Sequence, residues 1–463
     1  FCNYKRLRVS SKKALDEYVD FMVHEMSLFA PALRGAKFDA LYVGGGTPSV
    51  LDAEQLDRLL GALHEHYAFH ADAQKNFEYD PAVMSSERIE VVKRYGFTRY
   101  SFGIQSIDVD INVLHNRGRQ GPMHLERQFG MLLSEDAPYA VNVDFLLGLD
   151  GTTPEGMLAE VEDTLTRHGP DEVSIYMISP TAEYVERHFD GEPSRYREFL
   201  AGFEERVPVA MKEVAARCGY RITASGKHLL KLIRKESRKA KRGSLRSYCD
   251  IPTQIHRPLN LLGFGDSARS RIHGVLSYRA EHDTEQRSAD SPRYIVRRRS
   301  MEDEVFGYVA LVLRDGNRLS RADFERVFGT DLLQLCREPV EKLVALGAAT
   351  LSDEGVEMMP QSRQERLRDI LFFLPKARLE SVKSASSRGA SGPRSDGSAV
   401  DVRDIEEAVR PLQEGAALPS GWVLQSIGAA GITVDHPEGD RVLVKFLAPA
   451  GAHPAFASTA RFD

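Results

Sequence analysis

Apolar and polar positions alternate in two regular patterns along the first half of the chain. Short runs of strand-forming residues predict β-strands at 39–43, 75–79, 98–104, 140–147, 172–177 and 220–224. Apolar residues at helical spacing predict helices at about 11–30, 53–66, 85–94, 120–134, 153–167 and 193–217. Strands that alternate with helices in this way form parallel sheets, and their number favours an open or closed (β/α) barrel over a Rossmann pair.

The pattern changes near Met301 to short helices without parallel strands. Helices are predicted within 305–312, 321–328, 332–346 and 363–373, with a small hairpin at 348–360. Residues 381–400 have the Ser- and Gly-rich composition of a linker, and strand-like runs at 431–434 and 441–446 follow it together with one short helix. We therefore expect an α/β barrel with a basic insertion at 1–300, a small helical domain at 301–376, a flexible linker at 377–400 and an accessory α+β module at 401–463.

The first predicted barrel strand ends in Gly44-Gly45-Gly46-Thr47-Pro48. Three glycines remove every side chain where the strand would leave the sheet, so a ligand can touch the backbone there. Asp52 is placed to cap the next helix, with Gln55 three residues further on. A triple glycine alone fits a tight turn without a ligand equally well.

Polar residues lie on or beside three further predicted strands. Glu78 closes one strand, Gln105 closes the next, and Asp144 lies within the apolar run of a third. An acid among strand-forming residues needs a partner or a ligand. Arg117 follows close enough for its guanidinium to fold back over the same mouth and bind a carboxylate. Together these side chains predict a site for a zwitterionic ligand that carries a ribose.

Composition excludes several classes of protein. The 463 residues are 42% hydrophobic, and 61 basic residues against 67 acidic ones give a net charge of −6, which argues against general adhesion to nucleic acid or membranes. No apolar stretch reaches the length of a membrane span, so we expect a cytoplasmic protein. Four scattered cysteines cannot form a disulfide framework in a chain of this size, and we expect the interior ones to be packed thiols.

A basic run extends from Lys227 to Arg246, with nine Lys or Arg residues against the single acid Glu236. The usual interpretation of such a run is a solvated helix face. The alternative is a contact surface for an acidic partner, such as a carrier protein, or for substrate carboxylates or phosphates.

Seven short sequence blocks lie in order between residue 1 and about residue 270. The blocks are Phe1-Cys2-Asn3-Tyr4, Gly44-Gly45-Gly46-Thr47-Pro48, Phe77-Glu78-Tyr79-Asp80-Pro81, Gly103-Ile104-Gln105-Ser106, Asn116-Arg117, Asn142-Val143-Asp144-Phe145-Leu146-Leu147-Gly148 and Leu262-Gly263-Phe264-Gly265. In this order they resemble the oxygen-independent coproporphyrinogen III oxidase-like (HemN-like) branch of the radical S-adenosylmethionine (SAM) enzymes. Residues 311–373 resemble the small C-terminal helical domain of that family.

The resemblance implies a partial (β/α) barrel with a [4Fe–4S] cluster on a C-x3-C-x2-C loop and SAM on the cluster's unique iron. Cys2 is implied to be the last cysteine of that loop, and we expect the other two upstream of Phe1. In this family the glycine loop receives the amino group of SAM. The resemblance assigns the charged methionine end to Glu78 and Arg117, and the ribose hydroxyls to Gln105 and Asp144.

By the same resemblance, the cluster reductively cleaves SAM to a 5′-deoxyadenosyl radical that takes hydrogen from a substrate, with electrons from a donor such as flavodoxin or ferredoxin. We favour a tailoring enzyme for a specialised metabolite that performs methyl transfer, methylene transfer or cyclopropanation, often with two SAM molecules bound. The altered region 225–260 and the added module 401–463 favour this interpretation.

Three other interpretations stay open. The sequence does not identify the catalytic residues. The first is oxidative decarboxylation of coproporphyrinogen III, whose propionates could use the basic run. The second is a haem chaperone without turnover, but the chain lacks the His-Asn-x-x-Tyr-Trp stretch of that branch and has residues 248–257 in its place. The third is a catalytically inactive binding module that keeps the barrel. Tyr176 and His256 lie near the predicted mouth, where either could pack or meet substrate.

Overall fold

The computed structural model describes residues 11–118, 120–133, 137–178, 180–226, 229–236, 260–266, 268–281, 293–315, 317–360, 369–374, 423–428, 431–435 and 441–445. Cys2, His256, the linker at 377–400 and most of the basic run lie outside these residues. The chain divides into two compact units. The first takes Phe1–Val19, Phe38–His64 and Phe69–Leu245, and the second takes Asp20–Lys37, Glu65–Ala68 and Arg246–Asp463.

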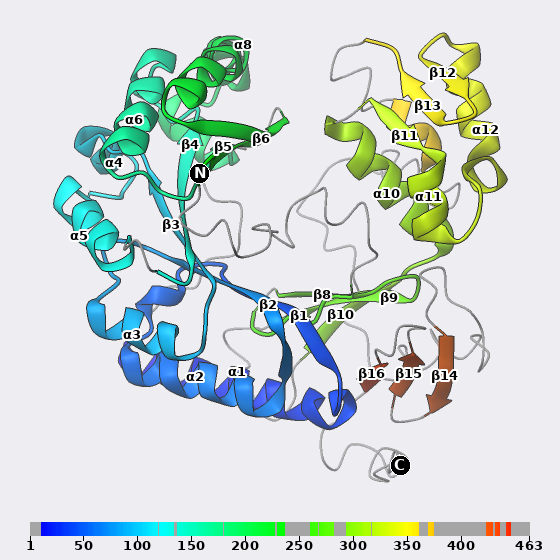
Figure 1. Ribbon diagram of the computed structural model, residues 1–463, viewed down its shortest axis with the longest axis horizontal. Helices are drawn as coiled ribbons and strands as arrows, with labels where there is room; N and C mark the ends of the chain where they lie inside the picture. Colours follow the sequence, from blue (N-terminus) through cyan, green and yellow to red (C-terminus); the bar gives the residue numbers. More distant parts are fainter. Residues whose placement is uncertain are drawn as a thin grey trace. The chain divides into compact units, whose positions relative to one another are not determined.

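A seven-stranded sheet forms the centre of the first unit (Figure 1). Strands β2 to β5 pair in parallel, as the strand–helix alternation predicts. The sheet order is β1 (Lys37–Val43), β2 (Ala68–Tyr79), β3 (Arg99–Gln105), β4 (Ala140–Leu147), β5 (Glu172–Met177), β7 (Leu229–Arg234) and β6 (Tyr220–Gly226).

Helices cover the outer face of this sheet because they follow its strands in sequence and carry apolar stripes (Figure 1). The six predicted helices are present, and the short helices α4 and α7 were not predicted. The helices are α1 (Lys12–Phe29), α2 (Ala53–His66), α3 (Ser86–Arg94), α4 (Val109–Leu114), α5 (Pro122–Leu132), α6 (Pro154–Arg167), α7 (Ala182–His188) and α8 (Pro193–Arg217).

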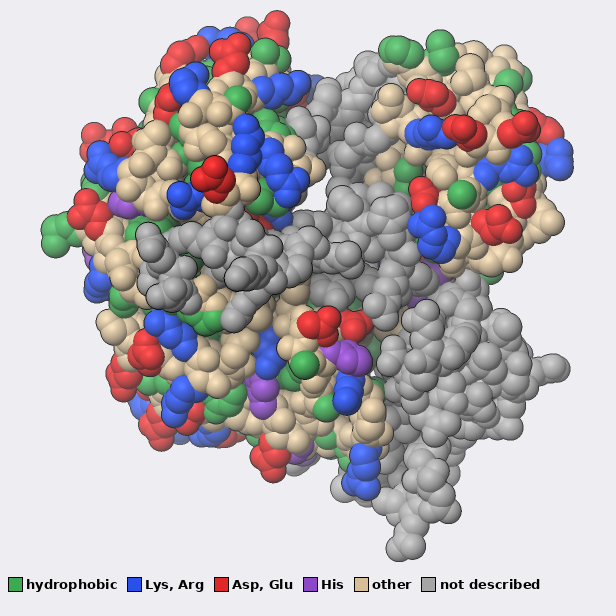
Figure 2. Space-filling model, viewed as in Figure 1, with side chains coloured by type: hydrophobic (Ala, Val, Ile, Leu, Met, Phe, Trp, Pro, Cys, Tyr) green, Lys and Arg blue, Asp and Glu red, His purple; other side chains and the backbone are tan. Residues whose placement is uncertain are grey.

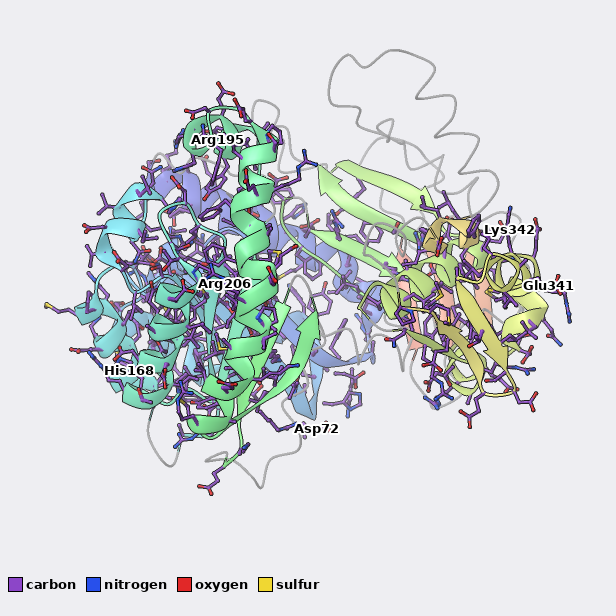
Figure 3. All side chains as sticks on the ribbon, turned by 90° about the horizontal axis from the view of Figure 1, so that it is seen from above. Asp72, His168, Arg195, Arg206, Glu341 and Lys342 are labelled. Carbon is purple, nitrogen blue, oxygen red and sulfur yellow. The ribbon has the colours of Figure 1, made fainter. Side chains whose placement is uncertain are left out.

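Local sequence signals set where these helices begin. Asp52 and Gln55 cap α2 reciprocally, each side chain accepting a hydrogen bond from the other's backbone N–H at 2.9 Å. Helix α8 is the longest, and Arg195 and Arg206 lie along it (Figure 3). Arg206 forms an ion pair with Glu155 of α6, with Nη1 and Oε1 2.5 Å apart.

The interpretation of the basic run as a helix face is wrong for residues 229–234. These residues form β7, which pairs antiparallel with both β5 and β6 and so lies between two of the predicted strands. Leu230 and Leu232 alternate with Lys231, and this period of two suits a strand. The predicted helix was based on charge density, which carries no information on periodicity.

The second unit contains an antiparallel sheet of β8 (Arg269–Ile272), β9 (Leu276–Glu281) and β10 (Arg293–Arg298), none of which was predicted. Of the helix predicted at 363–373, residues 363–368 lie outside the described residues. The other predicted helices and the hairpin after Met301 are present around one apolar core that includes Val309, Phe324 and Leu343. They are α10 (Met301–Asp315), β11 (Arg318–Ser320), α11 (Arg321–Phe328), α12 (Leu332–Ala345), β12 (Ala349–Ser352), β13 (Gly355–Met358) and the 3-10 turn η3 (Leu371–Phe373).

Three strands are described in the accessory module. β14 (Val423–Gly428), β15 (Gly431–Asp435) and β16 (Arg441–Lys445) form an antiparallel sheet. Two of them coincide with predicted strand-like runs. The helix predicted for this module lies outside the described residues.

On the described surface in Figure 2, acidic and basic side chains are interspersed over both units, consistent with the small net charge of −6. None of the helices in the described ranges combines the length and apolar character that crossing a membrane requires.

Candidate functional site

The strands of the first unit have one apolar and one polar face because successive side chains point to opposite sides. The outer face carries buried rings such as Tyr100 and Phe102, and Phe102 contacts Phe129 of α5 with ring centroids 5.3 Å apart. The opposite, inner face carries polar side chains from five strands. They are Asn76 and Glu78 of β2, Arg99 and Ser101 of β3, Asn142 and Asp144 of β4, Glu172, Ser174 and Tyr176 of β5, and Lys231 of β7.

Hydrogen bonds join these inner side chains from strand to strand. Asn142 donates to Ser101 and to Asp144, both at 2.7 Å, and accepts from Ser174 at 2.9 Å. Ser101 also donates to Asp144 at 3.0 Å. Neutral donors on both sides therefore fix the Asp144 carboxylate in one orientation.

A buried ion-pair group lies on the same face. Arg99 donates through Nε and Nη2 to Oε2 of Glu172 at 3.0 and 2.8 Å, and through Nη1 to Asn76 at 2.6 Å. Lys231 Nζ is 3.4 Å from the same Glu172 oxygen. Burial by itself would raise the pKa of Glu172, but Arg99 and Lys231 outweigh it and lower that pKa.

The glycine loop lies beside Glu78. Gly45 N–H donates to Glu78 Oε2 at 3.4 Å, and the Tyr42 hydroxyl donates to Oε1. A Cβ atom at Gly44 would come within 2.6 Å of both Glu78 Oε2 and Tyr42 Cε1. The first glycine is therefore required by the close approach of Glu78, whereas Gly45 and Gly46 have open space around them and positive φ angles of 76° and 56°.

Gln105 ends β3 in a conformation that favours glycine, with φ at 62°. A Cβ at Gly103 would lie 2.3 Å from Gln105 Nε2, so the missing side chain makes room for the folded-back amide. Backbone strain in a non-glycine residue persists where the surroundings impose it, and such residues cluster at ligand sites.

The loop after α4 closes over the end of β3. Arg117 Nη1 is 3.4 Å from Gly103 O, and Gln120 Nε2 donates to the same carbonyl at 3.0 Å. Gln120 Nε2 also lies 3.2 Å from Asp80 Oδ1, on the segment after β2. These contacts hold Arg117 at the strand ends, where the sequence predicts it.

Asp144 lies where opposing electrostatic effects meet. Burial raises its pKa to about 6, Arg99 lowers that pKa, and Glu78 raises it. Its hydrogen bonds from Asn142 and Ser101 also favour the ionised form. The carboxylate is therefore ionised at neutral pH, but only narrowly.

The structure brings together most of the side chains predicted from the sequence. Glu78, Gln105, Arg117 and Asp144 gather at one end of β2, β3 and β4, and Thr47 precedes the 3-10 turn η2 (Pro48–Val50) beside the glycine loop. Their roles remain predictions. Cys2 lies outside the described residues, and among those that are described no three His, Cys, Asp or Glu side chains form a group suited to a metal ion.

Sequence reasoning missed several polar residues of this site, among them Tyr42, Arg99, Gln120, Glu172 and Lys231. All of these except Gln120 lie on strands, and the available signal was the alternation of polar and apolar residues within each strand. Tyr176 lies on the inner face of β5 beside Ser174, as expected for a residue near the mouth. Of the interior cysteines, Cys336 is buried, and burial raises its pKa to about 12.

The sequence is similar in part to two kinds of curated protein. Oxygen-independent coproporphyrinogen III oxidase from Escherichia coli is 29% identical over 178 residues, which are 38% of this chain and 38% of that protein. The heme chaperone HemW from Mycobacterium tuberculosis is 30% identical over 158 residues, 33% of this chain and 39% of that protein. No family model matches the sequence.

The solved structure of coproporphyrinogen III oxidase (HemN) from E. coli, described as a radical SAM enzyme, superimposes with a TM-score of 0.64. The alignment covers 80% of this chain and 86% of HemN, with 18% identity. The chain matches the HemN-like branch of the radical SAM proteins. The predicted fold class, an α/β partial barrel of the radical SAM type, is thereby confirmed.

The sequence match of this HemN-like chain spans less than two fifths of the length of the curated relatives. Radical SAM homologues use a [4Fe–4S] cluster and SAM. The polar inner face and the open glycine loop fit SAM, because carboxylate and amide groups suit ribose hydroxyls and a guanidinium suits a carboxylate. Cys2 would supply one thiolate for the cluster.

Proposed function

We propose that this chain is a radical SAM enzyme that binds SAM against the inner face of the barrel and alters a specialised metabolite by methyl transfer, methylene transfer or cyclopropanation. The observation that carries the SAM site is the convergence of Glu78, Gln105 and Asp144 from three adjacent strands beside a glycine loop. Gly44 and Gly103 each lack the side chain that would displace one of these groups.

Each part of the site has a distinct role in this proposal. The glycine loop receives the SAM amino group, Glu78 and Arg117 hold the charged methionine end, and Gln105 and Asp144 accept or donate to the ribose hydroxyls. Cys2 and two cysteines upstream of Phe1 hold the cluster, which supplies the electron for reductive cleavage of SAM when it is bound. The barrel orients the ligand and excludes water.

The choice of reaction rests on where the chain departs from its relatives. The region 225–260 lacks the haem-chaperone motif, and the module at 401–463 is additional. Oxidative decarboxylation of coproporphyrinogen III is the second candidate, favoured by the similarity to an enzyme of that name. A haem chaperone is the third, favoured by the similarity to HemW.

Two kinds of macromolecular partner belong to the proposal. One is an electron donor such as flavodoxin or ferredoxin. The other is an acidic carrier protein at the basic run from Lys227 to Arg246, and the burial of Lys231 removes one of the nine basic residues from that surface.

The test uses the full-length protein, purified without oxygen and reconstituted with iron and sulfide. We expect about four irons per chain and, after reduction with SAM, 5′-deoxyadenosine. S-adenosylhomocysteine among the products would indicate methyl or methylene transfer, and turnover of added coproporphyrinogen III would indicate decarboxylation instead. Haem binding without SAM cleavage would contradict the proposed enzyme.

The proposed SAM site has its own test. Arg117→Ala and Asp144→Ala should each weaken SAM binding to the reconstituted protein, measured by calorimetry. Arg94→Ala is the control, because Arg94 forms an exposed ion pair with Asp57 on the outer helices. Unchanged SAM affinity in both site variants would show that the residues are assigned wrongly.

A further inference from the structure

We propose that Arg99 is a positioning residue for the adenosine half of SAM, which acts through Asp144 by keeping that carboxylate ionised as an acceptor for the ribose hydroxyls. This inference rests on the proposed function, because it assumes that Asp144 receives the ribose. Arg99 itself lies too deep in the network, bonded to Glu172 and Asn76, to be offered as a ligand contact.

The position of the guanidinium carries the first step of the argument. Arg99 stands on β3, yet it donates to Asn76 on β2 and to Glu172 on β5. To reach β5 it must extend over the inner face of β4, the strand that carries Asp144. Hydrogen bonds from three of its nitrogens hold it there, and its side chain is only 13% exposed.

The charge balance of the inner face carries the second step. Arg99 and Lys231 are two buried cations of this face, and Glu172 can neutralise only one of them. An ionised Asp144 neutralises the other. A buried charge without a counter-charge is destabilising. The two cations therefore favour the ionised forms of Glu172 and Asp144.

The third step concerns the other influences on Asp144 among the described residues. Glu78 on β2 faces it as a like charge, and burial removes water. Tyr176 on β5, Ser101 on β3 and Asn142 on its own strand are neutral groups. Arg99 attracts the ionised Asp144, and this attraction opposes both burial and Glu78.

A protonated Asp144 would donate one hydrogen bond where an ionised one accepts, so ligand affinity should follow its ionisation. We therefore expect binding of S-adenosylhomocysteine to the reconstituted holoprotein to weaken below a midpoint near the Asp144 pKa of about 6. Below that midpoint the affinity should fall about tenfold per pH unit.

Arg99→Met should move this midpoint upward by about one pH unit or more, the effect expected from losing one nearby opposite charge. Arg99→Lys keeps the charge and should leave the midpoint near that of the wild type. Glu172→Gln breaks the same ion pair but keeps the Arg99 charge, so it should not raise the midpoint. Arg99→Gln, which can still donate to Glu172, replaces the Met variant if that protein does not fold.

Calorimetric titrations between pH 5 and pH 9 measure the midpoints in all variants. A midpoint that is the same in wild type and neutral Arg99 variants would overturn the inference, and so would an equal shift in Arg99→Lys, because the effect would then depend on shape. If the wild type binds no S-adenosylhomocysteine at any pH, the proposed function fails instead. In that case infrared spectroscopy tests Arg99 directly. The carboxyl band of Asp144 is the one that Asp144→Asn removes, and its pH dependence is compared between the wild type and Arg99→Met.

Discussion

Gly44 and Gly103 act alike at the scale of single residues, because each leaves out a side chain where a polar group of the proposed site lies. The added Cβ would approach Glu78 Oε2 to 2.6 Å in one case and Gln105 Nε2 to 2.3 Å in the other. Both distances are far below ordinary van der Waals contact. The glycines of the site are therefore explained by their neighbours as well as by backbone conformation.

Gly44→Ala should weaken SAM binding about tenfold, because overpacking of this kind costs about 1 to 3 kcal/mol and displaces Glu78. The control is Gly130→Ala on α5, where a Cβ would meet nothing within 4 Å. Calorimetry on the reconstituted protein measures both. Equal affinities in the two variants would show that Glu78 does not bind the ligand from its position in the structure.

Gln105 allows backbone strain to be separated from ligand binding. At a φ of 62°, the folded state is strained by about 1 kcal/mol for a residue with a Cβ atom and by little for glycine. Gln105→Gly should therefore be more stable than Gln105→Ala by about 1 kcal/mol, although alanine is normally the more stable of the two. Both variants lack the amide and should lose the same SAM affinity. Urea unfolding and calorimetry test these two expectations separately, and a more stable alanine variant would contradict the first.

The sequence allowed polar residues toward the carboxyl ends of the strands to be predicted but not those at the strand starts. Glu78 and Gln105 lie at the ends of predicted strands, so their position at the edge of a parallel sheet can be deduced. Arg99 and Glu172 begin their strands next to loops, where a charge looks like an ordinary surface residue. Their burial depends on which strands become neighbours, and that is a property of the fold.

At the scale of elements, β7 makes the last part of the sheet antiparallel, where the sequence predicts parallel strands. It lies between β5 and β6, antiparallel to both, and it places Lys231 opposite Ser174. Most strands were predictable because their apolar runs are short and bounded by helices. This one was not, because its apolar residues lie in a basic run and β5, one of its two partners, is remote in sequence.

Lys231→Met should destabilise the first unit by about 3 kcal/mol, because it removes one of the two cations that neutralise the buried Glu172. Lys235→Met is the matched control, since Lys235 is exposed just beyond the end of the same strand. We expect the control to change stability by less than about 0.5 kcal/mol. Urea unfolding followed by circular dichroism measures the difference, and equal effects would indicate that Lys231 faces solvent.

At the scale of the whole molecule, each unit carries a buried acid whose pKa is raised by burial, Asp144 in the first unit and Glu25 in the second. In the second unit Glu25 is fully buried, accepting hydrogen bonds from Gly265 N–H and from the Tyr294 hydroxyl, both at 2.9 Å. The rings of Phe29 and Tyr278 lie next to that of Tyr294. Within the described part of the chain no cation pairs with Glu25, and burial raises its pKa to about 7.

This raised pKa makes the second unit less stable as pH rises. The folded state binds the Glu25 proton more tightly than the unfolded state does, so its stabilisation is complete below about pH 4.5 and is lost as pH rises through about 7. The loss is about 3 kcal/mol. Glu25→Gln, whose amide is neutral at every pH, should not show it, and Asp144 affects both proteins equally.

Because each unit has its own core, global unfolding need not be a single transition, and a local measurement is required. Hydrogen exchange of peptides from β8 and β9, corrected for the intrinsic pH dependence of exchange, reports the opening of the second unit. From pH 5 to pH 8 we expect the opening free energy to fall in the wild type and to stay level in Glu25→Gln. Parallel profiles in the two proteins would mean that Glu25 stays ionised throughout, with Gly265 and Tyr294 compensating for the lost water.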